Sequence, residues 1–248
     1  MAVPKRVSDR LSKGLRKYRK ILKDALHRDV NETDTVTIVK GILSDVLGWD
    51  RYREITSEVA IRGTFVDIAI VEEEHTHYLI EVKAIGANLK DNHLRQAVGY
   101  GANHGVDWVV LTNGIAWQAH KIKFSKPITS DLVFEVNLLE DNLRNEAFGK
   151  CLFTLTKEGM SKEEIVSLYD QRQAMSRFNI TAILRNEDVL NKVRLLLKKA
   201  YPKIKATNAD VASVLEKEVL KRDVLDGEKA AYASRTIKRL LARHAKKP

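Results

Sequence analysis

The 248-residue sequence predicts an α/β protein in which a mixed β-sheet is sandwiched between helices and is followed by a second, all-helical domain. Two observations predict this fold class. Helical patterns and short apolar runs follow one another in the order helix, three strands, helix, strand pair. From about Thr156 onward the strand signals disappear. We therefore expect a basic helix at residues 1–30, an α/β domain at 31–150 and a basic helical domain at 156–248.

Two helices open the chain. Apolar residues recur at spacings of three and four over residues 5–29, which predicts a strongly basic amphipathic helix. This helix either packs against the rest of the protein or clamps a nucleic-acid backbone. A second helix is predicted to begin at Asn31, a favourable N-cap residue, and to end at Gly48.

Alternating and apolar runs then predict the strands of the sheet. A helix capped by Asn88 and ending near Ala102 separates the third and fourth strands. Asn113-Gly114 is a strong hairpin signal after the fourth strand. The expected strands are residues 53–60, 65–71, 77–83, 107–112, 115–121 and 132–136.

The remaining chain contains only helical patterns. The expected helices are residues 161–174, 186–200, 208–219 and 227–244. The last two helices resemble a helix-turn-helix pair in order, although their connection is long for that motif. The sequence has no internal repeat and no low-complexity tract.

The net charge of +10 is unevenly distributed. Residues 1–30 contain ten Lys or Arg against three Asp, and residues 191–248 contain sixteen against six acidic residues, so the 160 residues between them carry −7. Basic flanks around an acidic centre are suited to polyanion binding, because neutralising phosphates releases counterions. The alternative is that these flanks are solvated helices without a partner.

Composition excludes several classes of protein. The chain contains no apolar run of about 18 residues, and its basic start lacks the apolar core of a secretory signal. Its one cysteine, Cys151, has no partner for an internal disulfide and no neighbouring ligands at zinc spacing, so we expect a small buried residue there. We expect a cytoplasmic protein.

The main candidate site consists of Asp67, Glu81 and Lys83. A charged turn centred near Glu74 joins the second and third strands, so Asp67 is predicted to lie opposite Glu81. Opposed side chains have Cβ atoms roughly 4.5–5.5 Å apart, where two carboxylates repel unless a cation lies between them. Lys83 follows Glu81 by two residues and therefore shares its face. A divalent metal held this way indicates phosphoryl-transfer chemistry; the alternative is a cross-strand ion pair on a solvent face.

Further polar residues accompany this trio. Glu32 continues the apolar stripe of the second helix, where it is also explained as a first-turn acid that the helix dipole favours. Gln96 and Tyr100 lie one helical turn apart on the helix after Lys83, where they could hold water or a phosphate oxygen or simply be surface residues. His75 and His77 have ligand spacing but lie at the turn end of the hairpin, so we interpret them as solvated turn residues.

These residues together resemble the metal-dependent nucleases of the PD-(D/E)XK superfamily. The resemblance is carried by Asp67, Glu81-Val82-Lys83, the preceding Glu32 and the following Gln96-Ala97-Val98-Gly99-Tyr100. Residues 31–120, including Leu47-Gly48-Trp49-Asp50 and Leu111-Thr112-Asn113-Gly114, are similar to the N-terminal nuclease domain of type I restriction enzyme R subunits and to standalone, type IV-like restriction endonucleases. Val66 stands where the superfamily name has proline. The sequence contains no glycine-rich Walker loop, so we do not expect the translocating motor of an R subunit.

The resemblance implies a restriction-endonuclease-like fold and Mg²⁺-dependent hydrolysis of DNA in restriction or defence. Asp67, Glu81 and the Val82 carbonyl would hold Mg²⁺, which Mn²⁺ can replace. Lys83 would orient the attacking water or stabilise the transition state, and a role as base stays open. The implied catalytic residues are Asp67, Glu81, Lys83, Glu32, Gln96 and Tyr100, with Glu32 positioning water and the last two orienting the substrate or the lysine.

Other functions stay open at this point. One alternative is a catalytically inactive DNA-binding module that keeps the nuclease fold. Another is an RNA-directed nuclease, or a nuclease subunit that requires a partner. The helical C-terminal domain is expected to recognise DNA or to mediate assembly, and a homodimer would provide two active centres for two strands.

Overall fold

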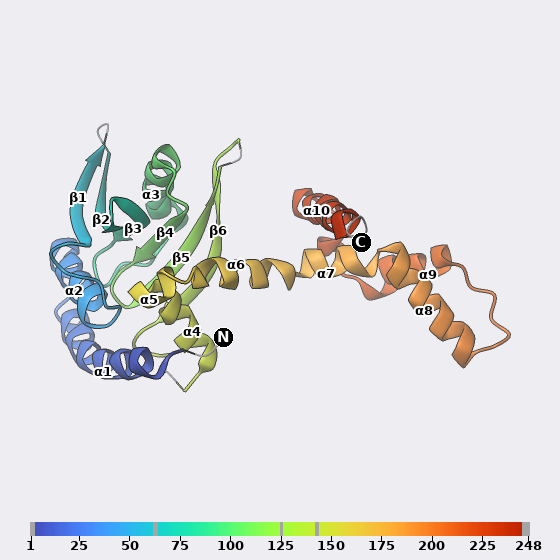
Figure 1. Ribbon diagram of the computed structural model, residues 1–248, viewed down its shortest axis with the longest axis horizontal. Helices are drawn as coiled ribbons and strands as arrows, with labels where there is room; N and C mark the ends of the chain where they lie inside the picture. Colours follow the sequence, from blue (N-terminus) through green and yellow to red (C-terminus); the bar gives the residue numbers. More distant parts are fainter. Residues whose placement is uncertain (1–2, 62–63, 125, 142–143, 245–248) are drawn as a thin grey trace. The chain divides into compact units, whose positions relative to one another are not determined.

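The computed structural model describes residues 3–61, 64–124, 126–141 and 144–244 (Figure 1). The chain divides into two compact units, Met1–Tyr169 and Asp170–Pro248. The first unit contains the β-sheet, and the second is built from helices. The predicted α/β fold with a helical C-terminal region is therefore confirmed.

The sheet of the first unit contains six strands that lie side by side in chain order. They are β1 (Ile55–Ile61), β2 (Thr64–Glu72), β3 (His75–Val82), β4 (Trp108–Thr112), β5 (Ala116–Lys123) and β6 (Thr129–Asn137). β3 and β4 are parallel, and the other neighbouring strands are antiparallel, which confirms the predicted mixed sheet. The parallel pair requires a crossover connection, which α3 (Asp91–His104) supplies.

Helices α1 (Lys5–His27) and α2 (Glu32–Asp45) pack against one face of the sheet, together with α4 (Glu146–Leu155) and the short α5 (Lys157–Met160). The apolar stripe of α1 is buried in this core, with Leu11 and Leu22 fully inaccessible. Figure 1 shows α1 and α2 lying side by side. The basic N-terminal helix is therefore part of the first unit, and only its outer side remains exposed.

Helix α3 covers the opposite face and forms a second, smaller core with residues that alternate with those of the first core, such as Ala69 and Leu79. The helix begins after Lys90, without a side-chain cap, so the prediction that Asn88 caps it is wrong. The physical reason is that the segment before α3 forms a turn, closed by a hydrogen bond from the Ala87 N–H to Ala84 O, and Asn113 holds this turn through hydrogen bonds that are described with the site.

The second unit contains helices, with one α-helix continuing into a π-helix. α7 packs against α10 and α8 packs against α9. The elements, including α6 at the boundary, are α6 (Glu164–Ala174), α7 (Arg177–Leu184), α8 (Glu187–Ala200), α9 (Asn208–Val214), the π-helix η1 (Leu215–Val219), the 3₁₀ helix η2 (Arg222–Val224) and α10 (Glu228–His244). Sequence periodicity did not predict α4 or the two-turn α7. No helix within the described ranges is both long and apolar enough to cross a membrane.

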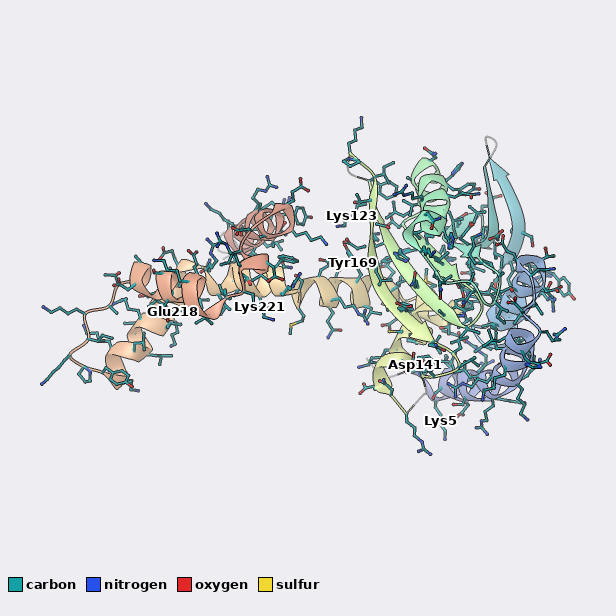
Figure 2. All side chains as sticks on the ribbon, turned by 180° about the vertical axis from the view of Figure 1, so that it is seen from behind. Lys5, Lys123, Asp141, Tyr169, Glu218 and Lys221 are labelled. Carbon is teal, nitrogen blue, oxygen red and sulfur yellow. The ribbon has the colours of Figure 1, made fainter. Side chains whose placement is uncertain are left out.

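The boundary between the units lies later than the expected start of the helical domain at residue 156. Met160 and Ile165 are buried in the core of the first unit. Tyr169, labelled in Figure 2, donates its hydroxyl hydrogen bond to Asp131 of β6 over 3.0 Å. Packing against the sheet therefore holds the start of the helical segment in the first unit.

Candidate active site

The predicted pairing of Asp67 with Glu81 depends on the register of β2 and β3. Ile68 pairs with Ile80 in this antiparallel ladder, so Asp67 and Glu81 are the next residues outward on the two strands. The Asp67 carboxylate accepts a hydrogen bond from the backbone N–H of Val82 over 2.7 Å. The two acidic residues thus meet at the end of the hairpin that lies away from its turn, as the sequence predicted.

The turn itself differs from the predicted one. The chain reverses at Glu73 and Glu74, which both have positive φ angles of 49° and 65°. A register shift between Ile70 and Val71 compensates for this shorter turn. The constant register expected from the sequence therefore holds at the site end of the hairpin and fails beside the turn.

Lys83 joins Glu81 to a residue from a different part of the chain. Its Nζ lies 2.8 Å from Glu81 Oε1 and 3.2 Å from Glu32 Oε2. Glu32 is the first residue of α2, whose N-cap Asn31 accepts a hydrogen bond from the Asp34 N–H, as predicted for this cap. The structure therefore brings Asp67, Glu81, Lys83 and Glu32 together at one end of β3.

The pKa values of this group reflect burial and mutual repulsion. Burial raises the pKa of Glu81, and the nearby Asp67 and Glu32 carboxylates raise it further, against the opposing effect of Lys83. Burial lowers the pKa of Lys83, but its contacts with Glu81 and Glu32 outweigh burial and raise the pKa overall. Lys83 therefore carries its proton at neutral pH.

One carboxylate oxygen of the site has no hydrogen-bond partner among the residues that the structure describes. Glu81 Oε2 is buried and accepts no hydrogen bond within the described part of the chain. A buried carboxylate oxygen without a donor is unfavourable, and a bound cation would satisfy it. The donor set of two carboxylates with a neighbouring carbonyl suits Mg²⁺, which uses few protein ligands and retains waters. No cluster of three or more His, Cys, Asp or Glu suited to a metal occurs among the described residues.

Asn113 positions the segment that follows Lys83. The Lys83 N–H donates to Thr112 O over 2.8 Å, which extends the parallel ladder between β3 and β4 to the lysine. The Asn113 amide then donates to Ile85 O at 3.2 Å and Ala87 O at 3.0 Å. Sequence reasoning interpreted Asn113-Gly114 only as a hairpin signal and missed this contact.

The remaining candidate residues lie on α3. Gln96 is exposed, whereas Tyr100 is 4% exposed and belongs to the core beneath α3. The Tyr100 ring stacks on His104 with centroids 4.5 Å apart, and burial raises the pKa of its hydroxyl. Although they lie one turn apart, the two side chains occupy different environments, and their roles at the site stay predictions.

The two histidines lie at the opposite end of β3. His77 is not a solvated turn residue, because its ring packs near Trp49 and its Nε2 lies 3.2 Å from Glu72 Oε2. Glu72 also pairs with Lys157 at 2.8 Å, and Lys157 in turn pairs with Glu54. This network links the starts of β1 and β3 to α5 and is separate from the candidate site.

The sheet, its covering helices and the site residues resemble one known architecture. A mixed sheet covered by helices on both faces, with Asp67 and the Glu81-Val82-Lys83 run meeting at one end of β3, is similar to the restriction-endonuclease-like core. Residues 50–132 match the family model for the type I restriction enzyme R protein N terminus. The predicted resemblance is therefore confirmed for that range, which contains every candidate site residue except Glu32. No curated protein and no solved structure matches the chain.

Proposed function

We propose that this protein is a Mg²⁺-dependent DNA endonuclease of restriction type. The observation that carries the proposal is the contact series Glu32–Lys83–Glu81 beside Asp67, because it gathers three carboxylates and one ammonium at a single strand end. The match to a restriction enzyme domain supports a role in restriction or defence and DNA as the substrate.

Asp67, Glu81 and the Val82 carbonyl would hold the metal. When bound, Mg²⁺ or Mn²⁺ would make a water molecule more acidic and offset the negative charge that develops on the phosphate. The buried Glu81 Oε2, which lacks a hydrogen-bond donor among the described residues, supports this assignment.

The chain's own residues would orient the reactants. A protonated Lys83 would donate to a phosphate oxygen or to the attacking water, so its role would be electrostatic. Glu32 would hold the Lys83 ammonium in place through the contact already formed. Gln96, which is exposed on α3, would help to orient the substrate, and Tyr100, which is buried beneath the same helix, would help to orient the lysine.

Cleavage assays test the proposal. Supercoiled plasmid, single-stranded DNA and RNA would each be incubated with the protein in Mg²⁺, Mn²⁺ or EDTA. We expect plasmid cleavage with either metal, none in EDTA, and a loss on the order of 10²-fold or more for Lys83→Ala. Asp67→Ala should be inactive. Lys121→Ala is the matched control, because Lys121 is also a partly buried strand lysine in an ion pair, with Asp107.

Several outcomes would contradict the proposal. Cleavage by Lys83→Ala or Asp67→Ala at the wild-type rate would reject the site. Binding of DNA without cleavage in any metal would favour the inactive module, and cleavage of RNA alone would change the substrate. Activity that appears only with a second protein would make the chain a partner-dependent subunit.

We further propose that two copies of the protein act together on a duplex. Light scattering, which measures the mass of the DNA complex, tests this.

Metal binding has a readout that is independent of activity. A ligand that binds only the folded state at 100 times its Kd stabilises that state by about 2.7 kcal/mol. Saturating Mg²⁺ should therefore raise the Tm of the wild type by several degrees and leave that of Asp67→Ala unchanged. An equal rise in both proteins would show that the metal binds elsewhere.

A further inference from the structure

The outer side of α1 carries a straight row of basic residues. Lys13, Arg16, Lys20 and Lys23 recur at spacings of three and four, and all four are exposed. At 100° per residue they lie within an arc of about 80° on the helix, opposite its buried stripe. We call these four residues the α1 stripe.

The α1 stripe differs from three other basic residues of the helix, which contact the protein. Arg10 binds both oxygens of Glu158 at 2.6 Å, Lys17 lies 2.6 Å from Asp45, and Arg19 donates to the carbonyl of Leu138 at 2.6 Å. The four residues of the stripe form no ion pair with any described residue. Like charges three or four residues apart destabilise a helix. The repulsion within the α1 stripe is therefore not offset by an ion pair with any described residue.

The charge of the first unit is concentrated on this helix. Residues 5–27 contain nine Lys or Arg against two Asp, a net charge of +7, whereas residues 1–169 as a whole are neutral. The rest of the first unit is therefore acidic. The α1 stripe is a localised cationic surface on a unit whose residues outside α1 carry a net charge of −7.

The dimensions and composition of the α1 stripe fit one strand of a duplex. From Lys13 to Lys23 the helix rises about 15 Å, at about 1.5 Å per residue. About four or five phosphates of one strand span this length of duplex axis, at about 3.4 Å each. An anionic membrane fits less well, because Leu26 is the one large hydrophobic residue of α1 that is exposed.

The C-terminal end of α1 leads to the candidate active site. Val30 O accepts a hydrogen bond from the Ile85 N–H over 3.4 Å, and a Cβ on Gly86 would lie 2.7 Å from Asp29 Oδ1. The segment that leaves α1 thus contacts the segment that leaves Lys83, and Glu32 then contacts the lysine itself. A backbone lying along the α1 stripe would be directed toward these residues.

We propose that the α1 stripe binds the phosphate backbone of duplex DNA and guides it to the site formed by Asp67, Glu81 and Lys83. This inference rests on the proposed function, because it assigns a contact surface for the same substrate. Binding through it is independent of sequence and of metal, and it weakens as salt concentration rises.

The test measures binding in EDTA, so that cleavage does not contribute. Fluorescence anisotropy of a labelled duplex gives the Kd of the full-length protein between about 50 and about 200 mM salt. In the fourfold variant K13Q/R16Q/K20Q/K23Q, the slope of log K against log salt should fall by about 3–4, at about 0.9 per lost phosphate contact. The affinity at the lowest salt should fall by at least tenfold.

A matched pair of double variants separates the α1 stripe from net charge. K20Q/K23Q removes two charges from the stripe, and K126Q/K162Q removes two charges from exposed lysines elsewhere in the first unit. Only the first should lower the slope, by about 2. Circular dichroism checks that α1 stays helical, which is expected because Gln is a good helix former and all substituted side chains are exposed.

The results distinguish this inference from the proposed function. The role of the α1 stripe would be overturned if the fourfold variant kept the affinity and salt slope of the wild type, or if the two double variants had equal effects. In either case, plasmid cleavage by the wild type would still support the proposed nuclease activity. If the wild type bound duplex DNA through the α1 stripe but never cleaved it, the α1 stripe would be supported as a DNA-binding surface and the proposed nuclease activity would be rejected. Stripe-dependent binding to phosphatidylserine vesicles but not to duplex would overturn the proposed partner.

Discussion

Replacing Asn113 tests whether its side chain, in the turn between β4 and β5, holds the residues that follow Lys83 in place. The Asn113 side chain forms four hydrogen bonds: its amide donates to Ile85 O and Ala87 O, and its Oδ1 accepts from the N–H groups of Ile115 and Ala116. At about 1 kcal/mol for each neutral bond, Asn113→Ala should lower the free energy of unfolding by about 3–4 kcal/mol. For a unit of this size that is a fall in Tm of roughly 6–15 °C.

Asn137 offers a matched control on the same sheet. Its Oδ1 accepts from Leu139 N at 2.9 Å and Glu140 N at 3.2 Å in a similar local turn, but these two bonds connect no distant segment. Asn137→Ala should therefore cost about 1–2 kcal/mol. Thermal unfolding followed by circular dichroism compares the two variants under the same conditions.

The two variants should also differ in activity. At a temperature well below both melting points, Asn113→Ala should slow plasmid cleavage, because the backbone after Lys83 loses its support, whereas Asn137→Ala should cleave as the wild type does. A fall in Tm for Asn113→Ala no larger than that for Asn137→Ala would show that the hydrogen bonds to Ile85 and Ala87 do not stabilise the fold. Undiminished cleavage by Asn113→Ala would refute its role in positioning the lysine.

Two further predictions concern stability away from the site. Hydrogen bonding to Arg10 lowers the pKa of Glu158 below its ordinary value of 4.5. The ion pair therefore stabilises the folded state at pH values above 4.5, and this stabilisation is lost as the pH falls through the lowered pKa of the folded protein. Because the two side chains are partly exposed, at 26% and 37%, Arg10→Ala should lower the free energy of unfolding by only about 1–2 kcal/mol at neutral pH and by less at about pH 3. Urea unfolding of both proteins at both pH values measures this, and an equal loss of stability at the two pH values would contradict it. A Cβ on Gly159 would overlap the Phe153 carbonyl oxygen, so Gly159→Ala should destabilise the folded protein by about 2 kcal/mol or more. A Cβ on Gly99 in α3 would meet open space, so Gly99→Ala should stabilise the folded protein by up to about 1 kcal/mol. The reverse order of their melting temperatures would contradict this account.

The main secondary structure was readable from the sequence because its signals are local. The apolar spacing of Leu11, Leu15, Tyr18 and Leu22 predicted α1, and alternating runs predicted the strands around Asp67 and Glu81. The shorter α7 was missed, because two turns contain too few residues to establish a helical period. The start of α3 was misplaced, because Asn113 stabilises the turn before it from 28 and 26 residues away.

The chemical types in the candidate site and the meeting of Asp67 with Glu81 could be predicted from the amino-acid sequence, because side chains alternate along two strands joined by a short turn; the register shift between Ile70 and Val71, which keeps this pairing, could not. Three features appear only once the chain is folded: Glu32 contacts Lys83 across 51 positions of sequence, Asn113 supports the segment after the lysine, and Glu81 keeps a buried oxygen without a donor among the described residues. These features depend on how α2 and the turn after β4 pack around the end of β3. Contacts between distant segments arise from the burial of several elements together, which no local pattern specifies.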